Sequence, residues 1–233
     1  MERTEPARGT MIAGKYRIER TLGEGGMGVV VEATHAQLGN RVAIKLLRGP
    51  ASTEAMIRFQ REARIAAQLT SEHIAKVSDM GQTKGGDLFL VMELLEGHDL
   101  ATELAQRGTL PVSEAVDWVL QACEALSEAH LAGLVHRDVK PANLFLARRT
   151  RGRPPILKVL DFGLSKAHDG MEGAELTQTK TQFGTPQYMS PEQVRSTKHV
   201  DARTDQHALA LVLYEAVTGV PAYDGVSLSL IHI

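Results

Sequence analysis

The sequence predicts an α+β protein with two lobes, a small antiparallel sheet with one helix followed by a mainly helical half. Two patterns predict this fold class. Valine-rich runs with strand character fill residues 16–47 between turn formers, whereas apolar residues recur at helical spacing from residue 113 onward. With 233 residues, of which 43% are hydrophobic and 23% charged, the chain is long enough to build two cores.

The strands of the first half can be placed one by one. The runs "YRIERTL" (16–22), "GVVVEAT" (28–34) and "RVAIKLL" (41–47) are separated by "GEGGMG" and "HAQLGN", so we expect an antiparallel meander. Ser52 or Thr53 can cap a helix over "EAMIRFQREARIAAQL", because a hydroxyl satisfies a free backbone N–H at the helix start. Another strand pair follows through "DLFLVMELL".

The second half contains two strong helical patterns. The first, "SEAVDWVLQACEALSEAHLAG", opens at Ser113 and has Gly133 as its stop. Within it we expect Trp118 to pack rather than to recognise a ligand, and Cys123 to be a small buried residue. The second, "HALALVLYEAVTG" (207–219), is apolar on nearly every face, so we expect it inside a core.

Composition excludes several functions. A net charge of -2 argues against nucleic acid or an anionic membrane as the main partner. A single cysteine allows no internal disulfide, which fits a reducing cytoplasm, and nine histidines without HExxH spacing give little support to a histidine metal site. The start of the chain lacks a signal-peptide core, and no apolar run approaches about 18 residues. We therefore expect a soluble, cytoplasmic chain, in which a divalent ion held by carboxylates stays open.

The stretch "GEGGMG" places Gly23, Gly25 and Gly28 in a GxGxxG arrangement, in which backbone N–H groups can approach phosphates. A dinucleotide-binding fold would need a helix to begin among these glycines, whereas "VVVEA" follows. The lysine and hydroxyl of a Walker loop are absent as well. Two interpretations stay open, a glycine-rich hairpin folded over a nucleotide and a merely tight hairpin.

Four motifs occur in a fixed order: "VAIK" at 42–45, "HRDVKPAN" at 136–143, "DFG" at 161–163 and "SPE" at 190–192. With them the chain resembles the eukaryotic-type (Hanks-type) protein kinases from Tyr16 onward, and "GTPQYMSPEQ" is similar to the bacterial Ser/Thr branch. The resemblance implies a bilobal kinase fold with a flexible segment over 1–12, a first lobe and hinge over 13–95, and a second lobe over 96–233 that lacks its last helices.

The resemblance also assigns catalytic roles. Transfer of a γ-phosphoryl group requires charge neutralisation and an in-line nucleophile. The resemblance implies that Asp138 accepts or orients the substrate hydroxyl and that Lys140 neutralises the moving phosphoryl group. Lys45 would hold the α- and β-phosphates and be fixed by Glu62, while Glu54, the rival partner, lies where a capping role is favoured.

ATP and Mg2+, with Mn2+ as an alternative ion, are the implied cofactors. Asp161 and Asn143 would hold the metal, because hard cations take oxygen ligands. His136 is implied to pack beneath Phe162 rather than to act as acid or base. The remaining implied ATP contacts are the glycine-rich loop, the walls around the adenine and the segment along its edge: Leu22, Gly23, Glu24, Gly25, Gly26, Met27, Gly28, Val30, Ala43, Met92, Glu93, Leu95 and Phe145.

A regulatory segment is implied between Asp161 and Glu192. Thr177 and Thr179 match the spacing of autophosphorylated threonines in related bacterial kinases, and Arg137 would pair with the added phosphate. Thr185 would contact Asp138 and Lys140, and a second copy of the chain is the implied partner for trans-autophosphorylation. The alternative is that these are ordinary hydrophilic loop threonines.

Three features depart from the family pattern. The connection "ARRTRGRPP" is long, and its arginines at 148, 149, 151 and 153 favour a solvated hairpin tip over a site for an acidic partner. The arginine that would pair with Glu192 is missing, so we expect a buried, unpaired carboxylate there, which costs about 3 to 5 kcal/mol. Asp205 is present as the anchor of the catalytic loop, although Ala210 replaces the usual glycine.

Three functional hypotheses follow. The first is an active kinase that phosphorylates serine and threonine in proteins, and the chain carries every residue that this requires. The second is a nucleotide-binding regulatory pseudokinase or scaffold. The third is an inactive kinase fragment that exposes an apolar surface. Related bacterial kinases often carry a transmembrane helix after this domain, so the expected solubility concerns this chain alone.

Overall fold

The computed structural model describes residues 7–25, 28–47, 49, 52–149, 152–162, 186–195 and 200–223. The chain divides into two compact units: among the described residues, the first contains 7–68 and 76–95, and the second contains 69–75, 96–162, 186–195 and 200–223. The predicted first lobe, 13–95, includes residues 69–75, whereas in the structure these group with the second unit.

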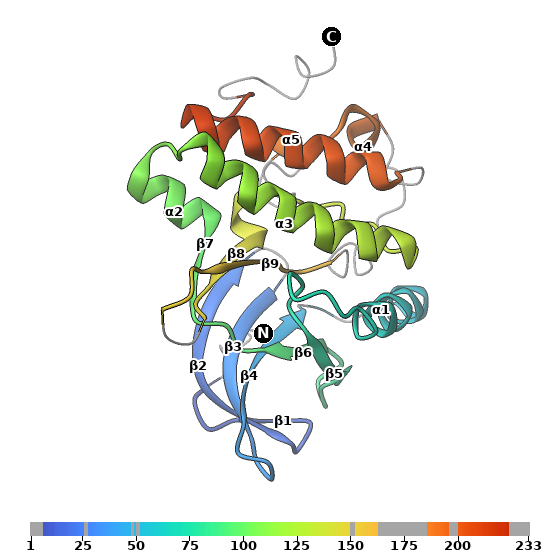
Figure 1. Cartoon of the computed structure of the whole chain (residues 1–233). Coiled ribbons are helices and arrows are strands. Elements are labelled where there is room, and N and C mark those ends of the chain that lie inside the picture. Colours follow the sequence, from blue (N-terminus) through green and yellow to red (C-terminus); the bar gives the residue numbers. More distant parts are fainter. Residues whose placement is uncertain are drawn as a thin grey trace. The chain divides into compact units, whose positions relative to one another are not determined.

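The first unit is built on a six-stranded sheet with the order β1-β2-β3-β4-β6-β5, in which all neighbours are antiparallel. Its strands are β1 (Met11–Ile12), β2 (Tyr16–Gly25), β3 (Gly28–His35), β4 (Arg41–Leu47), β5 (Val77–Gln82) and β6 (Leu88–Glu93) (Figure 1). The expected meander is therefore present. Of the segment predicted to be flexible, residues 1–6 lie outside the described part, but Met11–Ile12 pair with β2.

Helix α1 (Thr53–Ala66) begins where its cap predicts. The hydroxyl oxygen of Ser52 accepts a hydrogen bond from the amide of Ala55 at 3.1 Å, which satisfies one of the free N–H groups of the first turn. Phe59 and Ala63, both 1% exposed, pack with sheet residues such as Leu47 and Leu90. The alternating strand pattern and the helical pattern thus bury one shared core.

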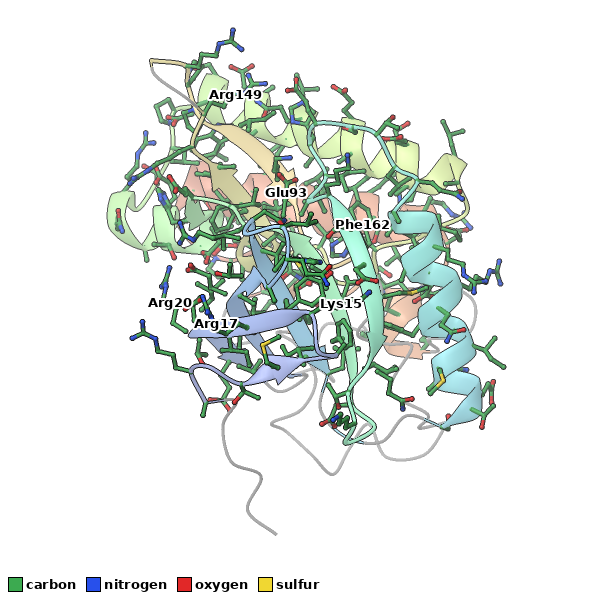
Figure 2. All side chains as sticks on the ribbon, turned by 90° about the horizontal axis from the view of Figure 1, so that it is seen from below. Lys15, Arg17, Arg20, Glu93, Arg149 and Phe162 are labelled. Atoms are coloured by element: carbon green, nitrogen blue, oxygen red, sulfur yellow. The ribbon has the colours of Figure 1, made fainter. Side chains whose placement is uncertain are left out.

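The polar end of the sheet is tied together by side chains. The hydroxyl of Tyr16 donates to the Asp79 carboxylate at 2.9 Å, and the ammonium of Lys15 lies 3.3 Å from the same carboxylate. Lys15 is labelled in Figure 2. These contacts join the start of β2 to β5, two strands that are not neighbours in the sheet.

The second unit is mainly helical. It contains α2 (Leu100–Arg107), α3 (Val112–Leu131), α4 (Pro191–Arg195) and α5 (Ala202–Thr218), with the 3-10 turns η1 (Pro141–Asn143) and η2 (Pro186–Tyr188). A small sheet of β7 (Gly97–Asp99), β8 (Leu144–Ala147) and β9 (Ile156–Val159) accompanies these helices (Figure 1). The predicted helix from Ser113 begins one residue earlier, at Val112. Helix α2 was not predicted, because eight residues are too few for a clear periodicity.

Helices α3 and α5 lie side by side (Figure 1). Trp118 on α3 is 7% exposed and packs in the core, as its position in the periodicity predicts. The prediction for α5 was wrong in part: Leu209 and Val212 are buried, but Ala210 and Tyr214 are exposed. A helix that packs against its neighbours on one side buries only that face. Apolar residues on all faces of a helix therefore do not guarantee that the whole helix is buried.

An apolar groove of about 700 Å³ runs between these helices. Cys123 lines it and is exposed, so the expectation of a buried cysteine was wrong. The residue lies at helical spacing, but its side of α3 is the one that opens into the groove. Within the ranges that the structure describes, no helix combines the length and apolar character needed to cross a membrane.

Residues 69–75 are held inside the second unit by hydrogen bonds. The carboxylate of Glu128 on α3 accepts from the amides of Thr70 and Ser71, both at 2.7 Å. The Nδ1 atom of His73 lies 3.0 Å from the carbonyl oxygen of Leu157 on β9. The link between α1 and β5 is therefore part of the helical unit.

Candidate active site

The loop between α3 and η1 is fixed by one buried carboxylate. Asp205, on α5, is fully buried and accepts hydrogen bonds from the backbone amides of His136 and Arg137, both at 2.8 Å. Its third partner is the Nε2 atom of His130, at 2.7 Å. Asp205 therefore anchors the loop, as the resemblance implies, and α5 determines where the backbone of the loop lies.

The electrostatics of Asp205 balance two opposing effects. Burial acts to raise the pKa of its carboxyl, but the hydrogen bond from His130, the nearby His136 and the two amide donors outweigh burial and lower this pKa. The ionised form is thus the one that the fold holds. A carboxylate can accept all three hydrogen bonds at once, whereas the protonated acid would offer fewer lone pairs.

Asp138, Lys140 and Asn143 converge within this loop. The ammonium of Lys140 lies 2.9 Å from the Asp138 carboxylate, and both side chains are less than one fifth exposed. The amide nitrogen of Asn143 donates to the carbonyl oxygen of Asp138 at 2.7 Å and to its carboxylate at 3.0 Å. Their chemical roles stay a prediction, but the structure brings the three side chains together.

A hairpin brings the two predicted metal ligands to one end of the small sheet. Leu144 on β8 pairs with Val159 on β9, and the amide of Leu160 donates to the carbonyl oxygen of Asn143 at 2.9 Å. Asp161 follows directly, with a left-handed φ of 59°, a conformation that non-glycine residues rarely adopt. With its nitrogen on Asp138, the Asn143 amide presents its oxygen on the other side.

This pair of residues fits a magnesium ion. Mg2+ is bound in proteins by one or two carboxylates together with waters and substrate phosphates, rather than by a complete protein cage. One carboxylate and one amide oxygen at a hairpin end match that donor set. Within the described ranges, no three or more His, Cys, Asp or Glu side chains form a metal cluster.

His136 has the packing role that the resemblance implies. Its ring centroid lies 5.0 Å from that of Phe162, which is labelled in Figure 2, and both residues are buried. Its Nε2 atom lies 2.6 Å from the carbonyl oxygen of Leu160. His136 therefore ties the loop that carries Asp138 to Leu160 and Phe162.

The first unit carries the predicted phosphate-binding lysine. Lys45 is 9% exposed and shares the face of β4 with Ala43 and Leu47, since alternate strand residues point the same way. That face packs against α1 through Phe59, and Glu62 lies one helical turn further along α1. The lysine and the glutamate thus belong to the same sheet–helix interface, and their pairing stays a prediction. The rival Glu54 lies in the first turn of α1, where its carboxylate pairs with Arg58 at 3.0 Å.

The glycine-rich hairpin connects β2 and β3. Gly28 has a φ of 157°, and a Cβ atom there would lie 2.0 Å from the carbonyl oxygen of Leu46, so the sheet itself requires this glycine. At Gly23 and Gly25, by contrast, an added Cβ would meet no described atom within 4 Å. Within the described residues, packing explains the glycine at position 28 but not those at 23 and 25, and the nucleotide interpretation stays a prediction.

The apolar residues predicted around the adenine occupy defined positions. Ala43 pairs with Met92 across β4 and β6, and the partly buried Val30 packs against the same cluster. Leu22 and Glu24 lie on exposed β2 positions, and the amide of Glu93 donates to the carbonyl of Lys76. Leu95 is partly buried at the end of the first unit, and Phe145 is partly buried on β8 of the second.

Several predicted residues lie outside the described ranges: Gly26, Met27, Thr177, Thr179, Thr185 and Arg151. The expectation for Glu192 was wrong, because this residue is exposed and accepts a hydrogen bond from the hydroxyl of Thr204 at 3.3 Å. Its position at the start of a short helix keeps the carboxylate in contact with water. Of the arginines in the long connection, Arg148 and Arg153 are exposed, while Arg149 pairs with Glu72.

Sequence reasoning missed two residues that support the loop. His130 contacts Asp205, and the buried Gln193 donates from its side-chain amide to the carbonyl oxygen of Arg137 at 2.8 Å. His130 lies in the last turn of α3, where a histidine interrupts the apolar periodicity, and that interruption was the available signal. No comparable signal marks Gln193, which directly follows the "SPE" motif.

A cavity of about 310 Å³ lies beside the loop within the second unit. Lys140 lines one part of it, and Tyr188 and Glu215 line another. The hydroxyl of Tyr188 donates to the Glu215 carboxylate, and burial and this carboxylate raise the pKa of the phenol. The cavity therefore combines one anionic group with a cationic group, Lys140, that itself contacts Asp138.

Comparison with known proteins finds a family match over most of the chain. Residues 16–230 match the family model described as protein kinase domain. The chain is 41% identical over 219 residues to the serine/threonine-protein kinase pkn3 of Myxococcus xanthus, covering 93% of this chain and 40% of that protein. It is 40% identical over 226 residues to the serine/threonine-protein kinase PknA of Mycobacterium tuberculosis, covering 94% of this chain and 50% of that protein.

A solved structure is similar over most of the chain. The PknI kinase domain of Mycobacterium tuberculosis superposes with a TM-score of 0.74 at 33% identity, covering 94% of this chain and 78% of that one. The chain spans half or less of the length of the two curated relatives named above.

Proposed function

Because this chain belongs to the protein kinase domain family, we propose that it transfers the γ-phosphoryl group of ATP to serine and threonine hydroxyls of proteins. The observation that carries the proposal is the cluster of Asp138, Lys140 and Asn143, held by a loop whose backbone is bound to Asp205. Family membership alone would also suit a protein that only binds nucleotide. A carboxylate, an ammonium and an amide that contact one another in a fixed loop are what phosphoryl transfer needs.

In this proposal each side chain has one task. The Asp138 carboxylate accepts a hydrogen bond from the substrate hydroxyl and orients its oxygen toward the phosphorus atom. Lys140, which already lies 2.9 Å from this carboxylate, places positive charge where the phosphoryl oxygens pass. Preorganised charge of this kind is worth about 3 to 4 kcal/mol of transition-state stabilisation per group.

For the cofactors, we propose roles for residues within each unit taken separately. Asp161 and Asn143 would hold Mg2+, or Mn2+ in its place, and Lys45, fixed by Glu62, would bind the α- and β-phosphates. When bound with ATP, the metal ion supplies positive charge that neutralises the phosphate oxygens. Gly23 and Gly25 would let backbone N–H groups approach the phosphates.

Proteins with accessible serine or threonine are the proposed substrates, and the cavity between Lys140 and Glu215 is a place for a substrate side chain. We place the activity in the cytoplasm, because the chain has one cysteine and depends on no disulfide.

For regulation, we propose that a second copy phosphorylates Thr177 or Thr179 and that the added charge pairs with Arg137.

The test is phosphate transfer from labelled ATP to a generic protein substrate in the presence of Mg2+. We expect Asp138→Asn and Asp161→Asn each to lower the turnover about 100- to 1000-fold. Asp117→Asn is the matched control, because Asp117 is an exposed aspartate on α3 and should leave turnover unchanged. Turnover that persists in both site variants would refute the assigned roles.

A thermal melt with and without ATP separates the alternatives. Stabilisation by ATP without phosphate transfer in the unsubstituted chain would identify a nucleotide-binding scaffold instead of a kinase. Mass spectrometry of the active chain should detect phosphate on Thr177 or Thr179. If neither is modified, the regulatory part of the proposal fails and the transfer activity is unaffected.

A further inference from the structure

Gln193 is a buried glutamine that joins two segments of the second unit. It lies on α4 and is 4% exposed. Its amide oxygen accepts from the backbone amide of Ser190 at 3.1 Å, and its amide nitrogen donates to the carbonyl oxygen of Arg137 at 2.8 Å. One side chain therefore binds both the segment before α4 and the residue that precedes Asp138.

The backbone that Gln193 contacts is in a rare conformation. Arg137 has a φ of 66°, in the left-handed region that residues with a Cβ atom disfavour, so its surroundings must hold it there. Its N–H group is bound by Asp205 and its carbonyl oxygen by Gln193. The next amide, that of Asp138, donates to the Nδ1 atom of His136 at 3.2 Å. The peptide that leads into Asp138 is thus held at its carbonyl and at its N–H.

The two supports of Arg137 lie on different helices, α5 and α4, but both are connected to α5. Asp205 lies on α5, and its neighbour Thr204 shares a hydrogen bond of 2.9 Å with the hydroxyl of Ser190. Ser190 in turn binds Gln193. The contacts form a closed ring, from α5 through Asp205 to the amide of Arg137, and from its carbonyl through Gln193 and Ser190 back to α5.

We propose that Gln193 is a positioning residue for Asp138, and that it couples the placement of residues 190–193 to the orientation of this carboxylate. The inference rests on the proposed kinase function, because it concerns the group that would face the substrate hydroxyl. A glutamine suits the task because one side chain must accept from Ser190 and donate to Arg137. A glutamate has no donor when ionised, and an asparagine is one methylene shorter.

The main test compares two glutamine-to-methionine variants of the chain. Gln193→Met keeps the side-chain length but removes the donor and the acceptor. Gln121→Met is the matched control, because Gln121 on α3 accepts from the amide of Leu157 at 2.8 Å, a contact of the same kind on a strand. We expect Gln193→Met to lower kcat about 10- to 100-fold with an unchanged KM for ATP, since misplaced groups slow the reacting complex. Equal kcat losses in the two variants, corrected for the folded fraction from thermal melts, would overturn the proposal.

A second variant gives a pH signature that a general loss of stability would not produce. In Gln193→Glu, the ionised carboxylate would face the Arg137 carbonyl, whereas the protonated acid could again donate to it. Burial raises the pKa of such a carboxyl. The ratio of the kcat of the variant to that of the unsubstituted chain should therefore rise as the pH is lowered from about 8 to about 6. A ratio that does not change with pH would contradict the assigned hydrogen bond.

Hydrogen exchange separates this inference from the proposed function. The amides of Arg137 and Asp138 should exchange faster in Gln193→Met than in the unsubstituted chain and in Gln121→Met. This readout needs no turnover, so it tests the positioning even if phosphate transfer is absent. Equal protection of these two amides in all three proteins would refute the positioning role, while absent transfer with faster exchange would refute only the proposed function.

Discussion

Glu32 in the first unit and Asp205 in the second are both buried carboxylates, yet they contact different kinds of atom. Glu32 on β3 is bound by the side chains of Arg20 on β2, at 2.9 Å, and Arg41 on β4, at 2.7 Å. Both arginine side chains are more than half exposed. Asp205 is bound by two backbone amides and by one histidine.

The difference lies in what each carboxylate fixes. The arginines on Glu32 can exchange their partner for water, because their charged ends already reach the solvent. The amides on Asp205 belong to the loop that carries Asp138, and they lose this buried acceptor if Asp205 changes. Burial is therefore a poor guide to the importance of a carboxylate for activity, and the identity of the bound atoms is a better one.

The strongest challenge to this comparison is Asp205→Asn. One acceptor oxygen becomes an NH2 group that faces a backbone amide or His130, so a buried donor is left unsatisfied. We expect the free energy of unfolding to fall by about 2 to 3 kcal/mol and kcat to fall about 100-fold. Urea unfolding and phosphate transfer measure the two losses. An unchanged kcat in a folded variant would mean that Asp205 does not position the loop.

The same substitution has a defined pH dependence. The folded pKa of Asp205 lies below its ordinary value of 3.8, so the ionised group stabilises the fold at every pH above that value. This stabilisation is lost as the pH falls below 3.8 toward the folded pKa. The unfolding free energies of Asp205→Asn and the unsubstituted chain should therefore converge only at acid pH, and convergence near neutral pH would contradict the lowered pKa.

His130→Phe sharpens the comparison by removing one partner of Asp205 and leaving both amides. We expect about 1 to 2 kcal/mol of lost stability, since one hydrogen bond to a buried charge is removed. The loss of kcat should be smaller than for Asp205→Asn, because the backbone contacts remain. Parallel urea unfolding and kinetic assays of the two variants test this order.

Glu32→Gln is the counterpart in the sheet. One side-chain oxygen remains as an acceptor, and the arginine side chains can form hydrogen bonds with water instead. We therefore expect a loss of stability of about 1 kcal/mol or less. The kcat should stay unchanged. A fall in kcat as large as that of His130→Phe would show that the sheet pair influences the site as strongly as the loop contacts do.

The smallest effect is expected for Tyr16→Phe. The phenol donates to Asp79, and burial, this hydrogen bond and the nearby charge raise its pKa to about 12. The variant should lose about 1 kcal/mol of stability at neutral pH. A raised pKa favours folding below pH 10, and this contribution is lost as the pH rises from 10 to about 12. The free energies of unfolding of Tyr16→Phe and of the unsubstituted chain should therefore converge when they are measured across that pH range.

The sequence predicted those parts of the molecule that depend on local patterns. The strands of the meander follow from alternation and turn residues, and α1 starts at Ser52 because one hydroxyl satisfies one amide. The convergence of Asp138, Lys140 and Asn143 could be predicted because they lie within six positions of one another. Contacts between residues that are close in the sequence can thus be predicted without a structure.

Long-range contacts were not predictable in the same way. His130 meets Asp205 across 75 positions, and Gln193 meets Arg137 across 56. Neither separation leaves a periodic signal. Cys123 and Glu192 were misplaced for a related reason, because exposure depends on which side of a helix its neighbours cover, and the helical pattern alone does not identify those neighbours.

The stretch 69–75 affects how the chain can be divided. It follows α1 and precedes β5, but Glu128 and Leu157, which hold it, come more than fifty positions later. A protease cut or a gene split after residue 95 would therefore not release two self-sufficient halves. The shorter piece would keep a strip that belongs to the longer one, and the longer piece would expose the places on α3 and β9 that this strip covers.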